Sequence, residues 1–594
     1  MKKKRLISGV TLGLIVAMTI SIPTIWAQSK QKSTHQWVWT QKNPKPNWWK
    51  WDETYYPSKP VRGGYFRTAS LVDLGLMNPN HWPVNNWSIL EGIYDRLIYS
   101  DGQYRPIIPW LAKSWKYTSP LTVTIKLKKG IRFHDGSPFN AKSVKYQFDW
   151  IKDPANGAWS RAWIKPIKSV QVVDNYTVRF HLKQTWSSFL DKLSMVPGWM
   201  MSTKALKGDA AVAKYESLED QLYDAKEANR PAKEIAALEK QVKKAEEAAK
   251  TVVSLDEWAV GSGPYMVEEN RPGNYVKLKR NPNWWFGKSI GKPDMPYFDG
   301  TITMVIPESS VQLANLKAGK IDSMVVDPVQ YNQVKDDPNL NVYITPSNFT
   351  IFLTFNHKEG PCKDIRVRKA ISHAIDRKAM IAAAAGGFGR PASCLFPDDH
   401  WAHNPNLKPV DFDPELSKKL LAEAGYAKGV TLRGGVLPIS ASIRFSQAVK
   451  AMLKRVNINW DVKILDSVAL ADQYRNMEYE VGVFVATYIK DPDAVLSSYY
   501  DPEAQGNMGR SNNKKANQLM EAARRELNFE KRKKIYYDVE KALYDNYEDA
   551  WMWHYTWITA TRKQVLGYNR EMQIAGGNAY WPTHPQWFKD GKSN

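Results

Sequence analysis

The sequence lacks the short motifs that mark most enzyme active sites. It contains no phosphate-cradling GxxxxGK(S/T), no HExxH, no GxSxG and no paired CxxC. No nucleophile beside a base and no pair of carboxylates with tuned pKa values stands out along the chain. An enzyme is therefore not expected, although a secreted hydrolase such as a glycosidase or a peptidase stays open as an alternative.

Cysteine is scarce as well, with 2 in 594 residues. Because two cysteines of an exported chain can close one loop, we expect a disulfide between Cys362 and Cys394. Two reduced thiols are the alternative. A catalytic cysteine is not indicated, since no histidine partner is evident for either residue.

Acidic residues are fewer than basic ones, 60 against 83, which gives a formal net charge of +23. A basic surface of this size attracts anionic partners such as nucleic acid, acidic lipid or an acidic ligand. The basic residues are spread along the chain, however, and no long Lys/Arg block occurs outside residues 2–5. We interpret them as a solvated surface and expect no nucleic acid partner.

The best candidate for a metal site is Asp398-Asp399-His400 together with His403. Histidine and carboxylate ligands suit several divalent metals. The segment is loop-like, however, so we interpret it as solvated and expect neither a metal nor another cofactor.

The N-terminus has the pattern of an export signal. Residues 2–5 are KKKR, an apolar run follows from Leu6 to Ile22, and Ala27 offers a small residue for cleavage. We expect a signal peptide at 1–27, with an uncleaved membrane anchor as the alternative, and a periplasmic or extracellular protein. Residues 28–60 are rich in tryptophan and bear prolines, and are expected to wrap a domain surface as an arm.

The rest of the chain alternates strand-like runs with helix-like ones, which indicates α/β structure. Leu121 to Leu127 alternates apolar and polar residues as a half-buried strand does, and Val170 to Leu182 resembles two strands joined at Asp174-Asn175. Helices are expected from Arg366 to about Ala385 and, with a strongly amphipathic pattern, from Lys514 to Tyr547.

Residues 208–253 differ in composition, being rich in Ala, Glu and Lys. Their apolar residues recur at steps of three and four in two runs, which predicts a helical hairpin with one apolar seam on each arm. The first run is Tyr215, Leu218, Leu222 and Ala225, and the second is Ile235, Leu238, Val242, Ala245 and Ala249. The hairpin is either a self-packed surface insertion or a docking arm for a partner or a second copy.

Several segments, in this order, resemble a known family. They are Gly63-Gly64-Tyr65, Glu91 to Leu97 (EGIYDRL), Pro109 to Trp115 (PWLAKSW), Lys129 to Phe139 (KGIRFHDGSPF), Gly261 to Tyr265 (GSGPY), Leu316 to Asp322 (LKAGKID), Asp364 to Ala370 (DIRVRKA) and Asp491-Pro492-Asp493. Each is weak alone, but together they are similar to the extracellular solute-binding proteins of ABC transporters, family 5, the oligopeptide, dipeptide and nickel type.

The resemblance implies an α/β, two-lobed periplasmic-binding-protein fold of the cluster C type. Lobe one is expected at 61–305, with a subdomain at about 91–194 and the hairpin at 208–253 as an insertion. Lobe two is expected at 306–550, and 551–594 return to lobe one. Such proteins close over a solute by hinge motion and deliver it to ABC permease subunits. We expect a monomer, and a receptor or scaffold with the same fold is the alternative function.

The expected ligand site departs from peptide-binding members. In those proteins a carboxylate a few residues before the Asp-Pro that matches Asp491-Pro492 pairs with the peptide ammonium. Here that position is Tyr488, whose phenol cannot neutralise an ammonium at pH 7. The ligand is therefore expected to be a peptide-like compound or an oligosaccharide, since tryptophan rings stack on sugars. The expected contacts are Trp82, Trp159, Trp163, Val326, Asp327, Phe484, Thr487, Tyr488 and Asp491.

Overall fold

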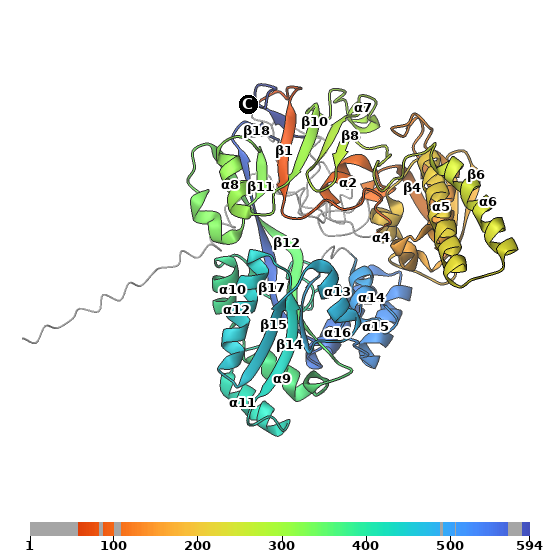
Figure 1. The fold of residues 1–594 in the computed structure, drawn as a ribbon. Helices are drawn as coiled ribbons and strands as arrows, with labels where there is room; N and C mark the ends of the chain where they lie inside the picture. Colours follow the sequence, from red (N-terminus) through yellow and green to blue (C-terminus); the bar gives the residue numbers. More distant parts are fainter. Residues whose placement is uncertain are drawn as a thin grey trace, which may run out of the picture.

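The computed structural model arranges the chain in two lobes (Figure 1). It describes residues 58–81, 87–99, 108–486, 491–504, 506–567 and 585–593. The expected signal peptide and nearly all of the tryptophan-rich arm lie outside these ranges. Among the described residues, no helix has both the length and the apolar character needed to cross a bilayer.

Lobe one is built on a four-stranded sheet in the order β1-β10-β9-β8. Its strands are β1 (Tyr65–Ser70), β10 (Gly300–Val305), β9 (Tyr275–Arg280) and β8 (Tyr265–Arg271). β1 runs parallel to β10, and the other neighbours are antiparallel. The sequence of β9 shows why it forms a strand here: Val276 and Leu278 are buried, and lysines alternate with them on the more solvated face.

A subdomain adds a second four-stranded sheet in the order β4-β5-β7-β6. Its strands are β4 (Ala112–Ser119), β5 (Thr122–Leu127), β7 (Thr177–Leu182) and β6 (Ile167–Asp174), with β2 (Ile98–Tyr99) paired to β3 (Ile108–Pro109) beside it. The strand expected at Leu121–Leu127 and the two expected around Asp174-Asn175 are confirmed. The helix α3 (Ala141–Lys152) begins at the capping side chain of Asn140 and packs on β6.

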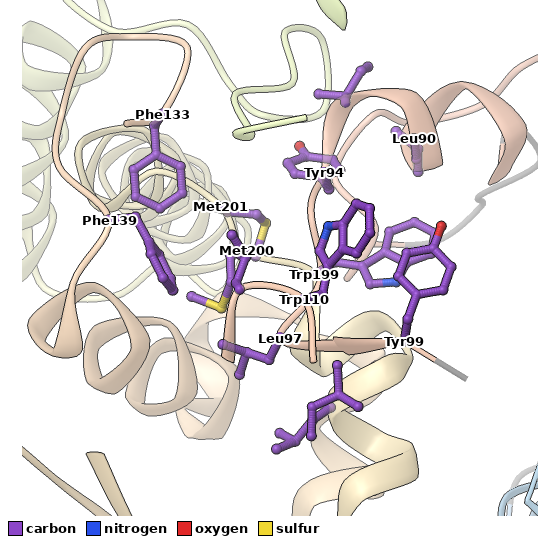
Figure 2. Packing of buried hydrophobic residues seen from close by; sticks show 14 of the residues in the cluster. Leu90, Tyr94, Leu97, Tyr99, Trp110, Phe133, Phe139, Trp199, Met200 and Met201 are labelled. Atoms are coloured by element: carbon purple, nitrogen blue, oxygen red, sulfur yellow. The ribbon is translucent and has the colours of Figure 1, made fainter. Parts of the chain in front are cut away.

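The subdomain and lobe one share one hydrophobic core. The same buried cluster contains Phe66 and Leu278 from the first sheet and Val123 and Phe180 from the second. Figure 2 shows part of it, including Leu90, Leu97 and a group of aromatic rings that contains Tyr94, Tyr99, Trp110 and Trp199. Because this core is continuous, the subdomain is fixed to lobe one.

The segment expected to form a helical hairpin contains α5 (Thr203–Glu227) and α6 (Ala232–Ala249), packed against each other (Figure 1). The seam residues Leu218, Ala225 and Ala245 are buried, and the other expected seam residues are half-buried. α5 begins at Thr203, after the capping side chain of Ser202 and five residues before the composition changes at 208. The hairpin is thus a two-helix projection that buries its own apolar residues.

Lobe two is built on a sheet in the order β11-β17-β12-β16, with β13 paired to β17. These strands are β11 (Ser323–Val325), β17 (Asp549–Arg562), β12 (Leu340–Phe355), β16 (Val481–Ala486) and β13 (Arg390–Pro391). A parallel pair, β14 (Val430–Val436) and β15 (Ile458–Ile464), lies beside β16. Its buried strand residues Val436, Ile458 and Trp460 are apolar, as expected of a strand covered by helices.

Helices cover this sheet. They include α11 (Pro414–Glu423), α12 (Ser440–Lys454), α13 (Ser467–Arg475) and α14 (Pro492–Tyr500). Each of the two long helices expected from the sequence is instead a pair: α9 (Ile365–His373) with α10 (Arg377–Ala385), and α15 (Lys514–Arg525) with α16 (Phe529–Asp545). The second helix of each pair starts at a capping side chain, Asp376 or Asn528, which accepts from a backbone N–H of the new first turn.

Two long strands join the lobes. β12 and β17 pair from Leu340 and Arg562 down to Thr354 and Asp549, and Figure 1 shows both running from the upper lobe into the lower one. α8 (Ser309–Lys317) and β11 lie beside β1 in the upper lobe. The expected boundaries at 306 and 551 are therefore corrected: residues 309–325 pack with lobe one, because the sheet of β11, β17 and β12 extends through both lobes.

The last two described strands lie in lobe one. β18 (Val565–Leu566) pairs with β19 (Trp587–Phe588), and both Trp587 and Phe588 are buried in the core of lobe one. Shorter helices complete this lobe: α2 (Trp87–Ile93), α4 (Phe189–Ser194) and α7 (Trp285–Ser289).

The expected disulfide is wrong. Cys362 and Cys394 are both free and fully buried. Cys362 packs in the cluster around Val367 and Ile371, whereas Cys394 packs in a different cluster around Leu395 and Tyr536. Each thiol serves as a small apolar side chain in its own core.

Candidate functional site between the two lobes

Trp159 and Trp163, two of the aromatic residues expected at the ligand, lie on the 3₁₀ helix η2 (Trp159–Ile164) of the subdomain. Their rings meet edge to face with centroids 4.7 Å apart, and both side chains are half-buried. Trp159 Nε1 donates to the carbonyl of Pro79 at 3.0 Å, which fixes one ring. The pair therefore presents aromatic surface that is partly open to solvent. The third expected tryptophan, Trp82, lies outside the described residues.

Val326 and Asp327 follow β11. The side chain of Val326, expected to contact the ligand, is fully buried in the cluster of Leu313 and Ile558. Asp327 caps a 3₁₀ helix and accepts two hydrogen bonds from Arg444 of α12, at 2.7 and 2.8 Å. Its carboxylate is therefore already paired with a cation.

The carboxylate of Asp491 is also paired with a cation. Its carboxylate is buried and accepts from both terminal nitrogens of Arg532, at 2.5 and 2.6 Å, and from the backbone N–H of Asp493 at the start of α14. Phe484 on β16 is half-buried in an aromatic group with Tyr474 and Tyr499. Asp491 therefore caps the start of α14. The expected contacts Thr487 and Tyr488 lie outside the described residues.

No pattern in the sequence indicates the contacts that join the two lobes apart from β12 and β17. The loop after β7 carries Trp186, Ser187 and Ser188, which reach α14 and the end of α15. The Ser187 N–H donates to the carbonyl of Arg524 at 2.8 Å, and the Ser188 hydroxyl donates to the carboxylate of Asp493. These three residues of the loop thus bind lobe two through the backbone as well as through side chains.

The electrostatics of this contact favour an ionised Asp493. Burial alone would raise the pKa of its carboxyl group, but Arg524, Lys192 and the hydrogen bond from Ser188 hold the pKa well below its ordinary value. Burial likewise opposes the charge of Arg532, and Asp491 raises the pKa of that guanidinium. Two carboxylates and three cations thus lie together where the subdomain meets lobe two.

The residues considered for a metal are engaged with other groups. Arg390 pairs with Asp398 at 3.3 Å and with Asp399 at 3.6 Å, while His403 Nδ1 lies 3.2 Å from a carboxylate oxygen of Glu540. Within the ranges that the structure describes, no group of three or more His, Cys, Asp or Glu side chains is placed to hold a metal ion.

The chain is similar to known solute-binding proteins over most of its length. A family model for bacterial extracellular solute-binding proteins, family 5, middle part, matches residues 106–507. Heme-binding protein A of Haemophilus influenzae is 24% identical over 473 residues, 75% of this chain and 78% of that protein. The dipeptide-binding protein of Escherichia coli is 24% identical over 504 residues, 80% of this chain and 86% of that protein.

A similar fold has been solved in the oligopeptide-binding protein AppA of Bacillus subtilis, in complex with a nonapeptide. The TM-score is 0.73 at 21% identity, and the match covers 89% of this chain and 100% of that one. Two lobes joined by long strands define a hinged binding protein. The family match spans more than half of the sequence, so this chain belongs to the bacterial extracellular solute-binding proteins of family 5.

Proposed function

We propose that the protein is the extracytoplasmic substrate-binding component of an ABC importer. It captures a solute between its two lobes and delivers it to membrane permease subunits, and it carries out no reaction on that solute. Two observations together support this function best. The strands β12 and β17 pair with each other and run through both lobes, and a separate hydrogen bond joins Ser188 of the subdomain to Asp493 of lobe two. Such an arrangement suits a protein that opens and closes over a ligand.

The solute is proposed to be a peptide-like compound that is recognised without a carboxylate bound to a free ammonium. Asp327 and Asp491, the acids nearest the expected site in the sequence, are paired with Arg444 and Arg532. A buried ammonium without a charged partner is strongly unfavourable. The related proteins are named for heme and for dipeptides, which supports a family that accommodates different solutes.

An oligosaccharide is the second candidate. The half-buried, edge-to-face pair Trp159 and Trp163 favours it, because tryptophan rings offer flat apolar faces to sugar rings. Substitution of Trp163 by Ala would weaken an oligosaccharide strongly and a small peptide-like solute little.

Mass spectrometry of the small molecules released from the purified protein by denaturation tests both candidates. Recovery of one class of solute in about equimolar amount, and its rebinding in calorimetry, would establish the ligand. Conversion of the solute into a product during incubation with the native protein would contradict the binding role. N-terminal sequencing of the exported protein should find a start near Gln28, and light scattering should find a monomer.

A further inference from the structure

The contact between the subdomain and lobe two consists of hydrogen bonds and charges that form when the lobes are closed and break when they open. We propose that Trp186, Ser187, Ser188 and Lys192 of the subdomain, with Asp493 and Arg524 of lobe two, form an interlobe latch. The latch sets the balance between open and closed lobes without touching the solute. This proposal deepens the proposed function and rests on it.

Hydrogen bonds across the latch come from consecutive residues of one loop. The Ser187 N–H donates to the carbonyl of Arg524 at 2.8 Å, and the Ser187 hydroxyl donates to the carbonyl of Ala523 at 3.0 Å. The Ser188 hydroxyl and, at 3.4 Å, the Trp186 Nε1–H both reach the same carboxylate oxygen of Asp493. Side chains and backbone of the subdomain thus satisfy groups at the C-terminal end of α15 and in the first turn of α14.

Water is excluded from this contact. Trp186 is 1% exposed, Ser188 0% and Asp493 5%, although the three residues belong to different lobes. A hydrogen bond to a charged carboxylate is stronger than one between neutral groups, and it strengthens when the surroundings are dry. Separation of the lobes would expose the Trp186 ring to water and would break every one of these interlobe bonds.

The charges of the latch also act across the lobes. Lys192 comes from α4, and its ammonium lies 4.9 Å from the centre of the Trp163 ring while it stabilises ionised Asp493. Arg524 donates to Asp493 at 3.0 Å from within lobe two. On opening, Asp493 would keep the two cations of lobe two, Arg524 and Arg532, and would lose Lys192, so closure is favoured by charge as well as by hydrogen bonding.

The position of the latch explains how it would matter for the solute. Its lobe-two half begins at Asp491-Pro492-Asp493, directly after residues 487–490, where the sequence predicts ligand contacts. A protein that binds its solute tightly only when closed loses apparent affinity in proportion to its closed fraction. Changes in the latch would therefore weaken every solute by the same factor, unlike changes in the site itself.

The two hydroxyl donors to the carboxylate of Asp493 allow a matched control. One carboxylate oxygen accepts from Ser188 across the lobes, and the other accepts from Ser497 within α14, at 2.9 Å. Ser188→Ala and Ser497→Ala each remove one hydroxyl donor from the same carboxylate. Only the first removes a bond between lobes, so a latch and a merely local support of Asp493 give different results.

The experiment measures the distance between spin labels on the two lobes of the solute-free protein, prepared by unfolding and refolding. Labels are attached at Val173→Cys on β6 and Val468→Cys on α13, whose side chains are 44% and 69% exposed. The native cysteines are buried and do not compete for the label. Urea unfolding of each variant confirms that it is folded.

We expect Ser188→Ala to lower the closed-to-open ratio by about tenfold, the effect of losing one charge-assisted hydrogen bond. Ser187→Ala, which removes a neutral bond, should shift the ratio in the same direction by a smaller factor. Ser497→Ala should leave it within about twofold of wild type. Equal distance distributions for Ser188→Ala and wild type, or equal shifts for Ser188→Ala and Ser497→Ala, would overturn the latch. A protein that releases no solute would contradict the proposed function and leave this measurement unaffected.

Discussion

Arg532 of α16 holds Asp491 in a buried ion pair at the start of α14. The two terminal nitrogens of the guanidinium lie 2.5 and 2.6 Å from the two carboxylate oxygens, and Arg532 also donates to the hydroxyl of Tyr536 at 3.1 Å. Since Asp491 also caps α14, this one pair joins two helices and positions the segment that follows residues 487–490.

The first prediction concerns this pair. Arg532→Met should lower the free energy of unfolding by about 3–5 kcal/mol, because it leaves the carboxylate of Asp491 buried without its cation. Arg525→Met is the control, since Arg525 forms an exposed i,i+4 pair with Glu521 and should contribute less than about 1 kcal/mol. Urea unfolding measures both. Similar losses for the two variants would mean that the Asp491 carboxylate is not a buried charge.

Local patterns in the sequence were sufficient for the hairpin and for several strands. The apolar residues of 208–253 recur at helical spacing, and the alternation in β5 puts Val123, Ile125 and Leu127 on one buried face. The breaks inside the two long helices were missed, although Asp376 and Asn528 have the side chains of N-caps. These breaks could have been predicted from the capping signals alone.

The interlobe contacts and the state of the cysteines could not be predicted in this way. Ser188 and Asp493 are 305 positions apart, and nothing in either segment indicates the other. The expected disulfide failed for the same reason, since Cys362 and Cys394 enter different hydrophobic clusters. The ion pair that neutralises Asp327 likewise depends on Arg444, which belongs to a helix far away in the sequence.

The second prediction concerns the thiols. Neither Cys362 nor Cys394 should react with a thiol reagent in the native protein, because both are buried and burial raises the pKa of both thiols. Two thiols per chain should titrate after denaturation without any reductant. Titration of none under these conditions would show that the cysteines are bonded in the exported protein.

The third prediction concerns the charge of the ligand. Peptides with a free amino terminus should bind no more tightly than the same peptides after N-acetylation, because Asp327 and Asp491 are each paired with an arginine. Calorimetric titration with matched pairs of dipeptides and tripeptides measures this. Tyr488→Asp should strengthen binding of the free peptides alone, since it supplies a carboxylate at the position expected to face the ammonium. Micromolar binding of free peptides, abolished by acetylation, would contradict the proposed mode of recognition.

The last prediction concerns pH and Asp549, which lies at the lower end of β17. The carboxyl group is 3% exposed and accepts from the hydroxyl of Tyr500, and burial raises its pKa to about 7. In the unfolded chain an aspartate titrates near pH 3.9, so between about pH 4 and 7 the native state binds the additional proton. The free energy of unfolding contributed by this group is therefore full below pH 4 and is lost as the pH rises through 7.

The loss amounts to at most about 4 kcal/mol, and Asp549→Asn should abolish it, because the amide stays neutral and still accepts from Tyr500. The variant should gain stability relative to wild type as urea unfolding is repeated from pH 4 to pH 8. Titrating groups that do not interact with Asp549 change both proteins alike, so they cancel in this difference. Asp545→Asn is the control, since Asp545 is half exposed and paired with Lys541 on the surface. Parallel pH profiles for the wild type and Asp549→Asn would mean that the carboxyl group of Asp549 ionises in the native protein as easily as in the unfolded chain, and would contradict the prediction.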